Sequence, residues 1–354
     1  MRLLSIDNVK EGLRVARNIY SAEGHVLLTE GMPLTDGYIE RLRELGVASL
    51  YIMDDQVGRI EVDELVTVQT RIHATRIIKE TMTDIKNDHG WDSNKVAETV
   101  NQMMEELIAN RHIMYNLVDV RAMNDYTFSH SIAVCILSLM VGAMANFGYH
   151  KLKELGIGAI LHDIGKVFVP DRILNKAGPL TPMEYLEVQK HTIFGYESLN
   201  SHDQIPKVSA HVAWQHHENY DGSGYPRGLK EHMIHEYARI VSLADVFDAL
   251  STDRIYRKRF MPHETIEFIR DKGKGRFDPE FSKIFLQRVA PFPVGTTVLL
   301  NTGEKAVVVK VSKDLPARPV VKVIIGQNGE SVPEPVDIDL RTDLTVFIVE
   351  ALHN

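Results

Sequence analysis

Seven side chains of the kinds that bind metal ions recur in this chain, and they come from at least five separate segments. They are His130, His162, Asp163, His191, His216, His217 and Asp245. Ten of the sixteen histidines lie between residues 130 and 235. Imidazole is the commonest metal ligand in proteins, and carboxylates also bind metal ions. No single helix or hairpin could hold all seven, so they meet only if a folded domain gathers them. Such a set suits a two-metal hydrolytic site.

The composition is that of a globular protein. The length of 354 residues predicts two or three domains, and 44% hydrophobic with 25% charged residues are ordinary values. The net charge of -8 disfavours binding to polymeric nucleic acid. The single cysteine, Cys135, excludes an internal disulfide and fits a reducing compartment. Because it lies in an apolar run, we expect a buried, unreactive thiol.

The start of the chain shows no apolar segment and no cleavage site of the kind found in secretory signals, which favours a cytoplasmic location. The most apolar stretch, residues 131–147, is slightly short for a membrane span. It is preceded by His130, one of the candidate ligands. We therefore predict a buried core helix there and no membrane span.

Changes in hydrophobic pattern predict a mainly α, multi-domain protein with four regions. Residues 1–60 alternate strand-like runs with glycine turns, which is typical of a small mixed α/β accessory domain. Residues 61–118 predict a helical linker, whose apolar positions either pack on the next domain or form a homodimer contact. Residues 119–290 predict an all-helical domain. Residues 291–354 predict a small β-rich segment, with strands at 294–300, 306–311, 320–325 and 345–349.

Two motifs combine a carboxylate with an apolar helix, although an adjacent histidine and aspartate taken alone are weak evidence, because such pairs are common by chance. His162 and Asp163 end an apolar helix, and neighbouring helical residues point about 100° apart. The imidazole can therefore bind one ion while the carboxylate reaches between two. Asp245 and Asp248 lie three residues apart in an almost wholly apolar helix, hence on one face. An ionised carboxylate is costly there unless it is paired or bound to a metal.

The other motifs have ordinary alternatives when each is taken alone. His130 would suit a helix cap or a satisfied core position, and His191 would suit an exposed surface. The run from Asp221 to Pro226, with two glycines and a proline, predicts a tight and stiff loop. Contact with a phosphate or a nucleotide is the functional alternative for that loop.

Together the motifs resemble the HD-GYP family, a branch of the HD phosphohydrolase superfamily, over about residues 119–290. The matching segments, in the order and at the spacing of the family, are Tyr126 to Ser131, His162 to Lys166, His191, His216 to Pro226, and Ala244 to Arg257. The β-rich tail also resembles segments that follow this domain in some relatives.

The resemblance implies an all-helical HD domain that hydrolyses cyclic di-GMP to linear pGpG, and in some members onward to GMP. It implies that the seven residues named first bind two metals, with Asp163 between them. Asp163 and Lys166 are the expected catalytic residues, and Lys166 is expected to contact the scissile phosphate. The residues expected to bind substrate are Lys166, Tyr225, Asp248, Arg254 and Arg257.

Two positions depart from the family pattern. Tyr126 stands where some relatives carry a glutamate that helps to bind a third metal, so two metals are expected here. Asn124 stands where an acidic residue is often found, which puts one guanine contact in doubt. The ligands are nitrogen and carboxylate oxygen without thiolate, which favours iron, manganese, nickel or cobalt over a structural zinc. On family grounds we expect iron or manganese.

In the expected mechanism two cations activate a bridging water, and the hydroxide attacks the phosphate in line and expels the ribose 3′ oxygen. His211 is a candidate for the acid that protonates this leaving group. One alternative function is a phosphodiesterase for another cyclic dinucleotide, such as a mixed guanine-adenine one. Another is a non-catalytic cyclic di-GMP sensor, against which the complete ligand set argues. The sequence leaves the regulatory partner, the input signal and the oligomeric state open.

Overall fold

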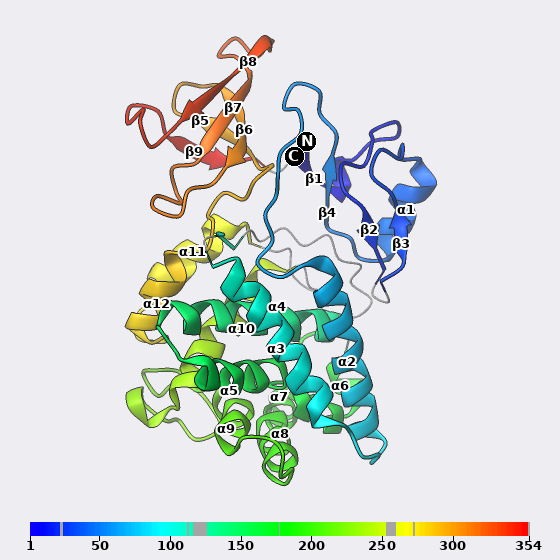
Figure 1. Cartoon of the computed structure of the whole chain (residues 1–354), viewed down its shortest axis with the longest axis vertical. Helices are drawn as coiled ribbons and strands as arrows, with labels where there is room; N and C mark the ends of the chain where they lie inside the picture. Colours follow the sequence, from blue (N-terminus) through cyan, green and yellow to red (C-terminus); the bar gives the residue numbers. More distant parts are fainter. Residues whose placement is uncertain are drawn as a thin grey trace.

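The computed structural model describes residues 1–21, 24–111, 113–115, 126–176, 178–252, 260–271 and 273–352. Helices occupy most of the chain from residue 68 to residue 286, and strands lie at residues 2–52 and 297–351. In Figure 1 the helices form one end of the molecule, while the N-terminal region and the C-terminal sheet lie together at the other. The predicted mainly α, multi-domain fold class is confirmed.

Among its described residues, the N-terminal region combines two small sheets, the short 3-10 helix η1 (Ile6–Asn8) and one α-helix around a compact apolar core. Its strands pair antiparallel as β1 (Arg2–Ser5) with β4 (Ser49–Ile52), and β2 (Ile19–Tyr20) with β3 (Val26–Leu28). The helix α1 (Asp36–Glu44) begins after Thr35, whose side chain accepts the N–H of Tyr38. A side-chain cap of this kind satisfies one of the unpaired donors of the first turn.

Four long helices form the core of the helical domain. They are α2 (Val68–Lys86), α3 (Ser93–Ala109), α4 (Tyr126–Met144) and α5 (Tyr149–Ile160). Ile78, Met103 and Leu137 belong to one buried apolar cluster, so α2 and α3 share the core of α4 and α5. Gly156 allows α3 and α5 to approach closely, because a Cβ there would lie 2.5 Å from Val100.

The apolar helix α4 is the buried core helix that the sequence predicted. Its segment Thr127–Met144 is long and apolar enough to cross a membrane, but 72% of that segment is buried inside the protein. Cys135 on this helix is fully buried, and burial raises the pKa of its thiol. The expectation of a buried thiol is therefore confirmed.

The remaining helices pack against these four or against one another. They are η3 (Ile164–Phe168), α6 (Asp171–Leu174), α7 (Pro182–Gln189), α8 (His191–Asn200), α9 (Lys207–Gln215), η4 (Glu231–Met233), α10 (Glu236–Ser251), α11 (Pro262–Asp271) and α12 (Pro279–Leu286). Of these, α10 is itself largely buried in the same core. The chain bends at Lys190, between α7 and α8. The bend places His191 at the first position of α8.

The C-terminal sheet is antiparallel, with strand order β8-β7-β6-β5-β9. Its strands are β5 (Thr297–Leu300), β6 (Lys305–Lys310), β7 (Val320–Ile325), β8 (Ser331–Asp339) and β9 (Ile348–Ala351). The sequence analysis missed β8, which contains Pro333 and Pro335. Proline removes a ladder donor and is tolerated in an edge strand, which is the place that β8 occupies.

The N-terminal region and the C-terminal sheet meet in what we call the terminal seam. Its apolar members are Met1, Ala16, Tyr51, Val57, Ile60, Val294, Val307 and Ile324. The Tyr51 hydroxyl donates to the carbonyl of Val294 at 3.0 Å, and the N–H of Leu3 donates to the carbonyl of Gly295 at 2.9 Å. Gly295 has a φ of +90°, and a Cβ there would lie 2.8 Å from the Tyr51 ring. The backbone therefore lies directly against this ring.

Candidate metal centre

The structure brings all seven candidate ligands together in the helical domain, at the ends or on the inner faces of different helices. His130 lies on α4, the pair His162 and Asp163 joins α5 to η3, and His191 begins α8. The pair His216 and His217 follows α9, and Asp245 lies on α10. The ligand atoms form two groups, and within each group all lie within 4.8 Å of one another.

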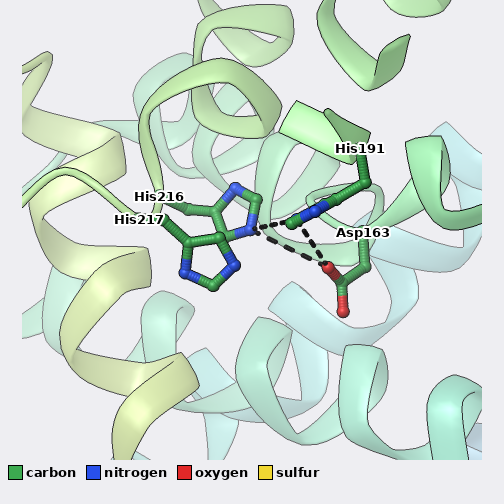
Figure 2. Close-up of side chains that lie close together, drawn as sticks. All are labelled: Asp163, His191, His216 and His217. Atoms are coloured by element: carbon green, nitrogen blue, oxygen red, sulfur yellow. Dashed lines mark hydrogen bonds and ion pairs between the residues drawn. The ribbon is translucent and has the colours of Figure 1, made fainter. Parts of the chain in front are cut away.

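The first group contains Asp163, His191, His216 and His217, whose side chains converge in Figure 2. The Nε2 atom of His191 lies 3.5 Å from Oδ1 of Asp163 and 3.3 Å from Nε2 of His216. Nε2 of His216 lies 3.8 Å from the same carboxylate oxygen. All but His217 are buried, so the group is largely closed to water.

The second group contains His130, His162 and Asp245. Nε2 of His130 lies 3.1 Å from Oδ1 of Asp245. Asp163 also reaches this group, because its Oδ2 lies 3.3 Å from Nε2 of His162 and 3.9 Å from Nε2 of His130. The two oxygens of Asp163 therefore face different groups, as expected of a carboxylate shared by two ions.

Asp245, on α10, also contacts both groups of ligands. Its Oδ1 faces His130, and its Oδ2 lies 3.7 Å from Nδ1 of His217. The side chains of Asp163 and Asp245 are nearly buried, at 2% and 12% exposure. The centre thus consists of two carboxylates between two sets of imidazoles.

The orientation of the histidines fits cations rather than hydrogen bonds. The Nδ1 atoms of His162, His191 and His216 lie 2.7, 2.6 and 3.0 Å from the carbonyl oxygens three residues earlier. A carbonyl oxygen can only accept, so each Nδ1 carries the proton and each Nε2 of the neutral ring offers a lone pair. Nε2 of His162 and Oδ1 of Asp163 are buried and have no hydrogen-bond partner among the described residues. Lone pairs that face one another without a proton between them match what divalent metal ions bind.

Burial and neighbouring charges favour the metal-binding protonation states. Burial lowers the pKa of His191, lowers that of His217 to about 3, and lowers that of His216 well below its usual value. Burial raises the pKa of Asp163, but Lys166 and His162 outweigh it and hold this pKa well below its ordinary range. Neutral imidazoles and ionised carboxylates are the forms that bind metals.

His130 differs from the other histidines of the centre. Burial lowers its pKa, but hydrogen bonds to Asp245 and Asp248 outweigh burial and raise the pKa to about 9. The Nδ1 atom of His130 lies 2.7 Å from Oδ2 of Asp248, and both side chains are buried. Asp248 was expected to contact substrate, yet its carboxylate lies behind the His130 ring instead.

A close contact between main chains fixes the distance between Asp163 and His191. A Cβ on Gly165 would lie 2.0 Å from the carbonyl oxygen of His191 and 2.5 Å from the amide nitrogen of Gly195. Real Cβ atoms essentially never come so close, so η3 and α8 can touch here only because residue 165 is glycine. Gly165 therefore sets the geometry of the centre.

The loop after His217 is held from inside the protein. The buried carboxylate of Glu218 accepts the N–H groups of Arg227 and Leu229 at 2.8 and 2.9 Å. A Cβ on Gly224 would lie 2.4 Å from the carbonyl oxygen of His217, so the loop folds back tightly on the ligand pair. The Tyr225 ring lies 4.8 Å from the His217 ring. This agrees with the expected place of Tyr225 beside the site.

The other predicted site residues are placed as follows. The Nζ atom of Lys166 lies 2.5 Å from Oδ2 of Asp163, at the edge of the centre. His211, the candidate acid, has ring contacts with Tyr196, Trp214 and His235, none of which is a candidate ligand. The predicted positions Asn124, Arg254 and Arg257, together with the side chain of Tyr126, lie outside the described residues.

Three contacts near the centre could not be foreseen from the sequence. Glu218 was noted as part of a motif, but its role as an acceptor for two loop amides has no signal in the sequence. The contact of Asp248 with His130 joins residues 118 positions apart. Tyr185 on α7 lies with its ring 6.3 Å from that of Tyr225, and nothing in its local sequence distinguishes it from a surface tyrosine.

Comparison with known proteins identifies two regions of the chain. The family model for the HD domain matches residues 102–281, and the model for a KOW domain associated with HD domains matches residues 297–354. A cyclic di-GMP phosphodiesterase of Pseudomonas aeruginosa is 32% identical over 255 residues, which are 72% of this chain and 61% of that protein.

Two further relatives cover less of the chain. A cyclic di-GMP phosphodiesterase of Thermotoga maritima is 42% identical over 162 residues, 46% of this chain and 44% of that protein. A 3′3′-cGAMP-specific phosphodiesterase of Vibrio cholerae is 32% identical over 192 residues, 54% of this chain and 37% of that protein. The chain thus covers less than two thirds of the length of each of these three relatives.

The HD match includes every candidate ligand and covers just over half of the chain, and the KOW match covers the C-terminal sheet. Both agree with the resemblance that the sequence motifs carried. The chain therefore belongs to the HD domain family, and its Gly224-Tyr225-Pro226 motif agrees with the resemblance to the HD-GYP branch.

Proposed function

We propose that this chain is a metal-dependent phosphodiesterase that hydrolyses cyclic di-GMP to linear pGpG. The observation that carries the proposal is the Asp163 carboxylate, whose two oxygens face two separate groups of histidines. The substrate class is supported by the relatives, since two of the three described above are named cyclic di-GMP phosphodiesterases. Further hydrolysis of pGpG to GMP would appear as a second product in the same assay.

The seven candidate ligands would hold two divalent metal ions, with Asp163 between them. A set of imidazole nitrogens and carboxylate oxygens without thiolate suits iron or manganese. When bound, such ions supply positive charge for the phosphate oxygens and lower the pKa of water. The buried ligand atoms without hydrogen-bond partners among the described residues support this part of the proposal.

Lys166 is the proposed contact for the scissile phosphate. Its side chain is 30% exposed while that of Asp163 is 2% exposed, so the ammonium lies where the centre opens to solvent. A positive charge at this place stabilises the charge that develops on the phosphate oxygens as the bond to the ribose 3′ oxygen breaks. Tyr225 covers the side of His217. Arg254 and Arg257 remain proposed contacts for guanine or phosphate.

Asp248 has a different proposed role from the one that the resemblance implied. Its carboxylate accepts a hydrogen bond from Nδ1 of His130, which leaves Nε2 directed at Asp245 and Asp163. Carboxylates behind metal-binding histidines fix the tautomer and the orientation of the ring. We assign Asp248 to positioning His130 rather than to binding guanine.

A second candidate function is hydrolysis of a mixed guanine-adenine cyclic dinucleotide. It is favoured by the 32% identity to a 3′3′-cGAMP-specific enzyme over 54% of the chain. The metal centre does not distinguish the two substrates, because both present the same phosphodiester to it. Turnover of both cyclic dinucleotides, measured side by side, separates the two candidates. A much larger kcat/KM for the mixed dinucleotide would make it, rather than cyclic di-GMP, the substrate.

The test uses protein prepared and loaded with iron or manganese in the absence of oxygen. Chromatography should show pGpG appearing from cyclic di-GMP, and metal analysis should show two ions per chain. The double variant His162→Ala with Asp163→Ala should form no pGpG and should not retain the two ions. A matched control, His150→Ala with Asp271→Ala, removes an exposed histidine and an exposed aspartate outside the centre and should keep both.

Three outcomes would contradict the proposal. Turnover by the double variant at the wild-type rate would show that the centre is elsewhere. Binding of cyclic di-GMP without any product would favour the non-catalytic sensor. A metal content of one would contradict the two-ion site.

Two expectations from the sequence stay predictions. A homodimer contact within residues 61–118 would have to use the exposed sides of α2 and α3, because their apolar sides are buried in the core. Mass measurement in solution would decide it. The cytoplasmic location is likewise untested.

A further inference from the structure

The helix α7 exposes large apolar side chains beside the candidate metal centre. None of its eight residues is buried. Met183, Tyr185 and Leu186 are 74%, 49% and 52% exposed. Large apolar side chains grouped on a surface are a mark of interaction sites.

Polar contacts, rather than apolar burial, hold α7 in place. Thr181 and Glu184 form a reciprocal capping box, and Pro182 occupies the first turn. Lys176 adds an ion pair with Glu184 at 2.6 Å. Since these groups fix the helix end, the exposed side chain of Tyr185 is not needed to anchor it.

A row of aromatic rings connects Tyr185 to the centre. The Tyr185 ring lies 6.3 Å from the Tyr225 ring at an angle of 76°, and the Tyr225 ring lies 4.8 Å from the ring of His217. His217 belongs to the first group of candidate ligands. Tyr185 therefore lies one ring beyond the residue that covers the centre, and half of its surface faces solvent.

We propose that Tyr185, supported by Tyr225, is a stacking platform for a purine base of the cyclic dinucleotide whose phosphate lies at the centre. This inference rests on the proposed function and extends it to a base-binding subsite. Each base of a cyclic dinucleotide is joined to a phosphate through one ribose, so a base must lie beside the metal ligands rather than over them. A flat, apolar and partly exposed ring offers what a base face requires, and stacking of this kind tolerates either guanine or adenine.

Steady-state kinetics provides the first test, with Tyr185→Leu, Tyr185→Phe and Tyr185→Trp. Leucine keeps an apolar side chain but removes the flat ring, so KM for the cyclic dinucleotide should rise about 10- to 100-fold. The kcat and the metal content should stay close to wild type. Phenylalanine and tryptophan keep a ring and should restore KM. Tyr149→Leu, which changes a tyrosine of 48% exposure on α5, is the matched control and should leave KM unchanged.

A spectroscopic measurement tests the stacking itself. A cyclic dinucleotide that carries 2-aminopurine in place of one base loses fluorescence when that base stacks on an aromatic ring. Quenching should occur with wild type and Tyr185→Phe, and it should be lost with Tyr185→Leu at saturating protein. A purely structural role of Tyr185 would change thermal stability but would not separate leucine from phenylalanine in this way.

The results distinguish the platform from the function on which it rests. If Tyr185→Leu matches wild type in both KM and quenching, the platform is wrong even when hydrolysis is observed. If wild type binds and quenches the probe, Tyr185→Leu does not quench it, and no cyclic dinucleotide is hydrolysed, the platform stands and the phosphodiesterase proposal fails. If wild type neither binds nor hydrolyses the cyclic dinucleotides, both fail.

Discussion

The terminal seam and the metal centre both join segments that are far apart in the sequence, but the seam uses mainly apolar side chains and the centre uses polar ones. The seam is an apolar cluster crossed by hydrogen bonds such as that from Tyr51 to the carbonyl of Val294. The centre is made of histidines and carboxylates, with buried atoms of His162 and Asp163 that have no hydrogen-bond partner among the described residues.

The contrast separates what stabilises the fold from what serves function. Burying apolar surface is favourable, and a buried hydrogen bond adds a modest net amount. Burying polar atoms without partners is costly, so a site that does it needs a ligand to offset the cost. We therefore expect changes in the centre to act on metal content and activity, and changes in the seam to act on stability alone.

The largest effect is expected from Asp163→Asn, which removes the charge that both groups of ligands share. Metal ions contribute several kcal/mol of transition-state stabilisation, so kcat/KM should fall at least about 1,000-fold. Kinetics with metal analysis measures the change, and Asp271→Asn at an exposed position is the control. If the Asp163→Asn variant kept both ions and most of its activity, Asp163 would not hold the shared position.

The next effect is expected from Gly165→Ala, which tests whether main-chain contact sets the geometry of the centre. The added methyl group would meet the carbonyl of His191, so η3 and α8 would have to separate. Overpacking of this kind costs about 1–3 kcal/mol of stability. Thermal unfolding and metal content should both fall. Gly90→Ala, where a Cβ meets nothing within 4 Å, should change neither. An unchanged metal content in Gly165→Ala would show that the centre tolerates the separation of η3 from α8, so that this main-chain contact does not set its geometry.

A smaller effect is expected from Asp248→Asn, which keeps the shape of the side chain behind His130 but removes its charge. Loss of a residue that orients a metal ligand typically lowers metal affinity about 10- to 100-fold. Competition with a metal indicator measures this directly. Glu236→Gln on the same helix is the control. If metal affinity is unchanged and KM for the dinucleotide rises instead, Asp248 binds substrate after all.

The smallest effect is expected from Tyr51→Phe in the seam. It removes one buried hydrogen bond to a carbonyl and should lower the free energy of unfolding by about 1 kcal/mol. Denaturant unfolding measures it, with Tyr149→Phe at an exposed position as the control. Metal content and activity should stay at wild-type values. A loss of activity would show that the seam and the centre are coupled, contrary to the comparison.

The candidate ligands could be found from the sequence because some of them contradict their surroundings and the others complete the same ordered set of motifs. Asp245 in an apolar helix has few structural explanations, and the adjacent pair His162 and Asp163 follows another such helix. The structure brings these residues together with the rest of the predicted set. The strongest indication of the site in the sequence was therefore a charged or polar side chain within, or at the end of, an apolar segment that folds as a buried helix.

The partners of these residues could not be predicted, because no local pattern encodes them. The contact of Asp248 with His130 joins two helices that are far apart in the sequence, so only the substrate role implied by the family resemblance could be stated beforehand. The strand β8 was missed because its prolines are acceptable only at a sheet edge, and edge position is decided by the other strands. The seam had no signal at all, since Tyr51 and Val294 are 243 residues apart and each resembles an ordinary core residue.

The terminal seam has a consequence for how the chain is made. The strand β1 leaves the ribosome long before residues 294–324 are synthesised. Met1, Val57 and Ile60 therefore remain without their C-terminal apolar partners while the helical domain is made. Truncation after α12 would leave the N-terminal side chains of the seam exposed to solvent. During biosynthesis the N-terminal region thus appears before the helical domain, but its apolar contacts are completed only after that domain.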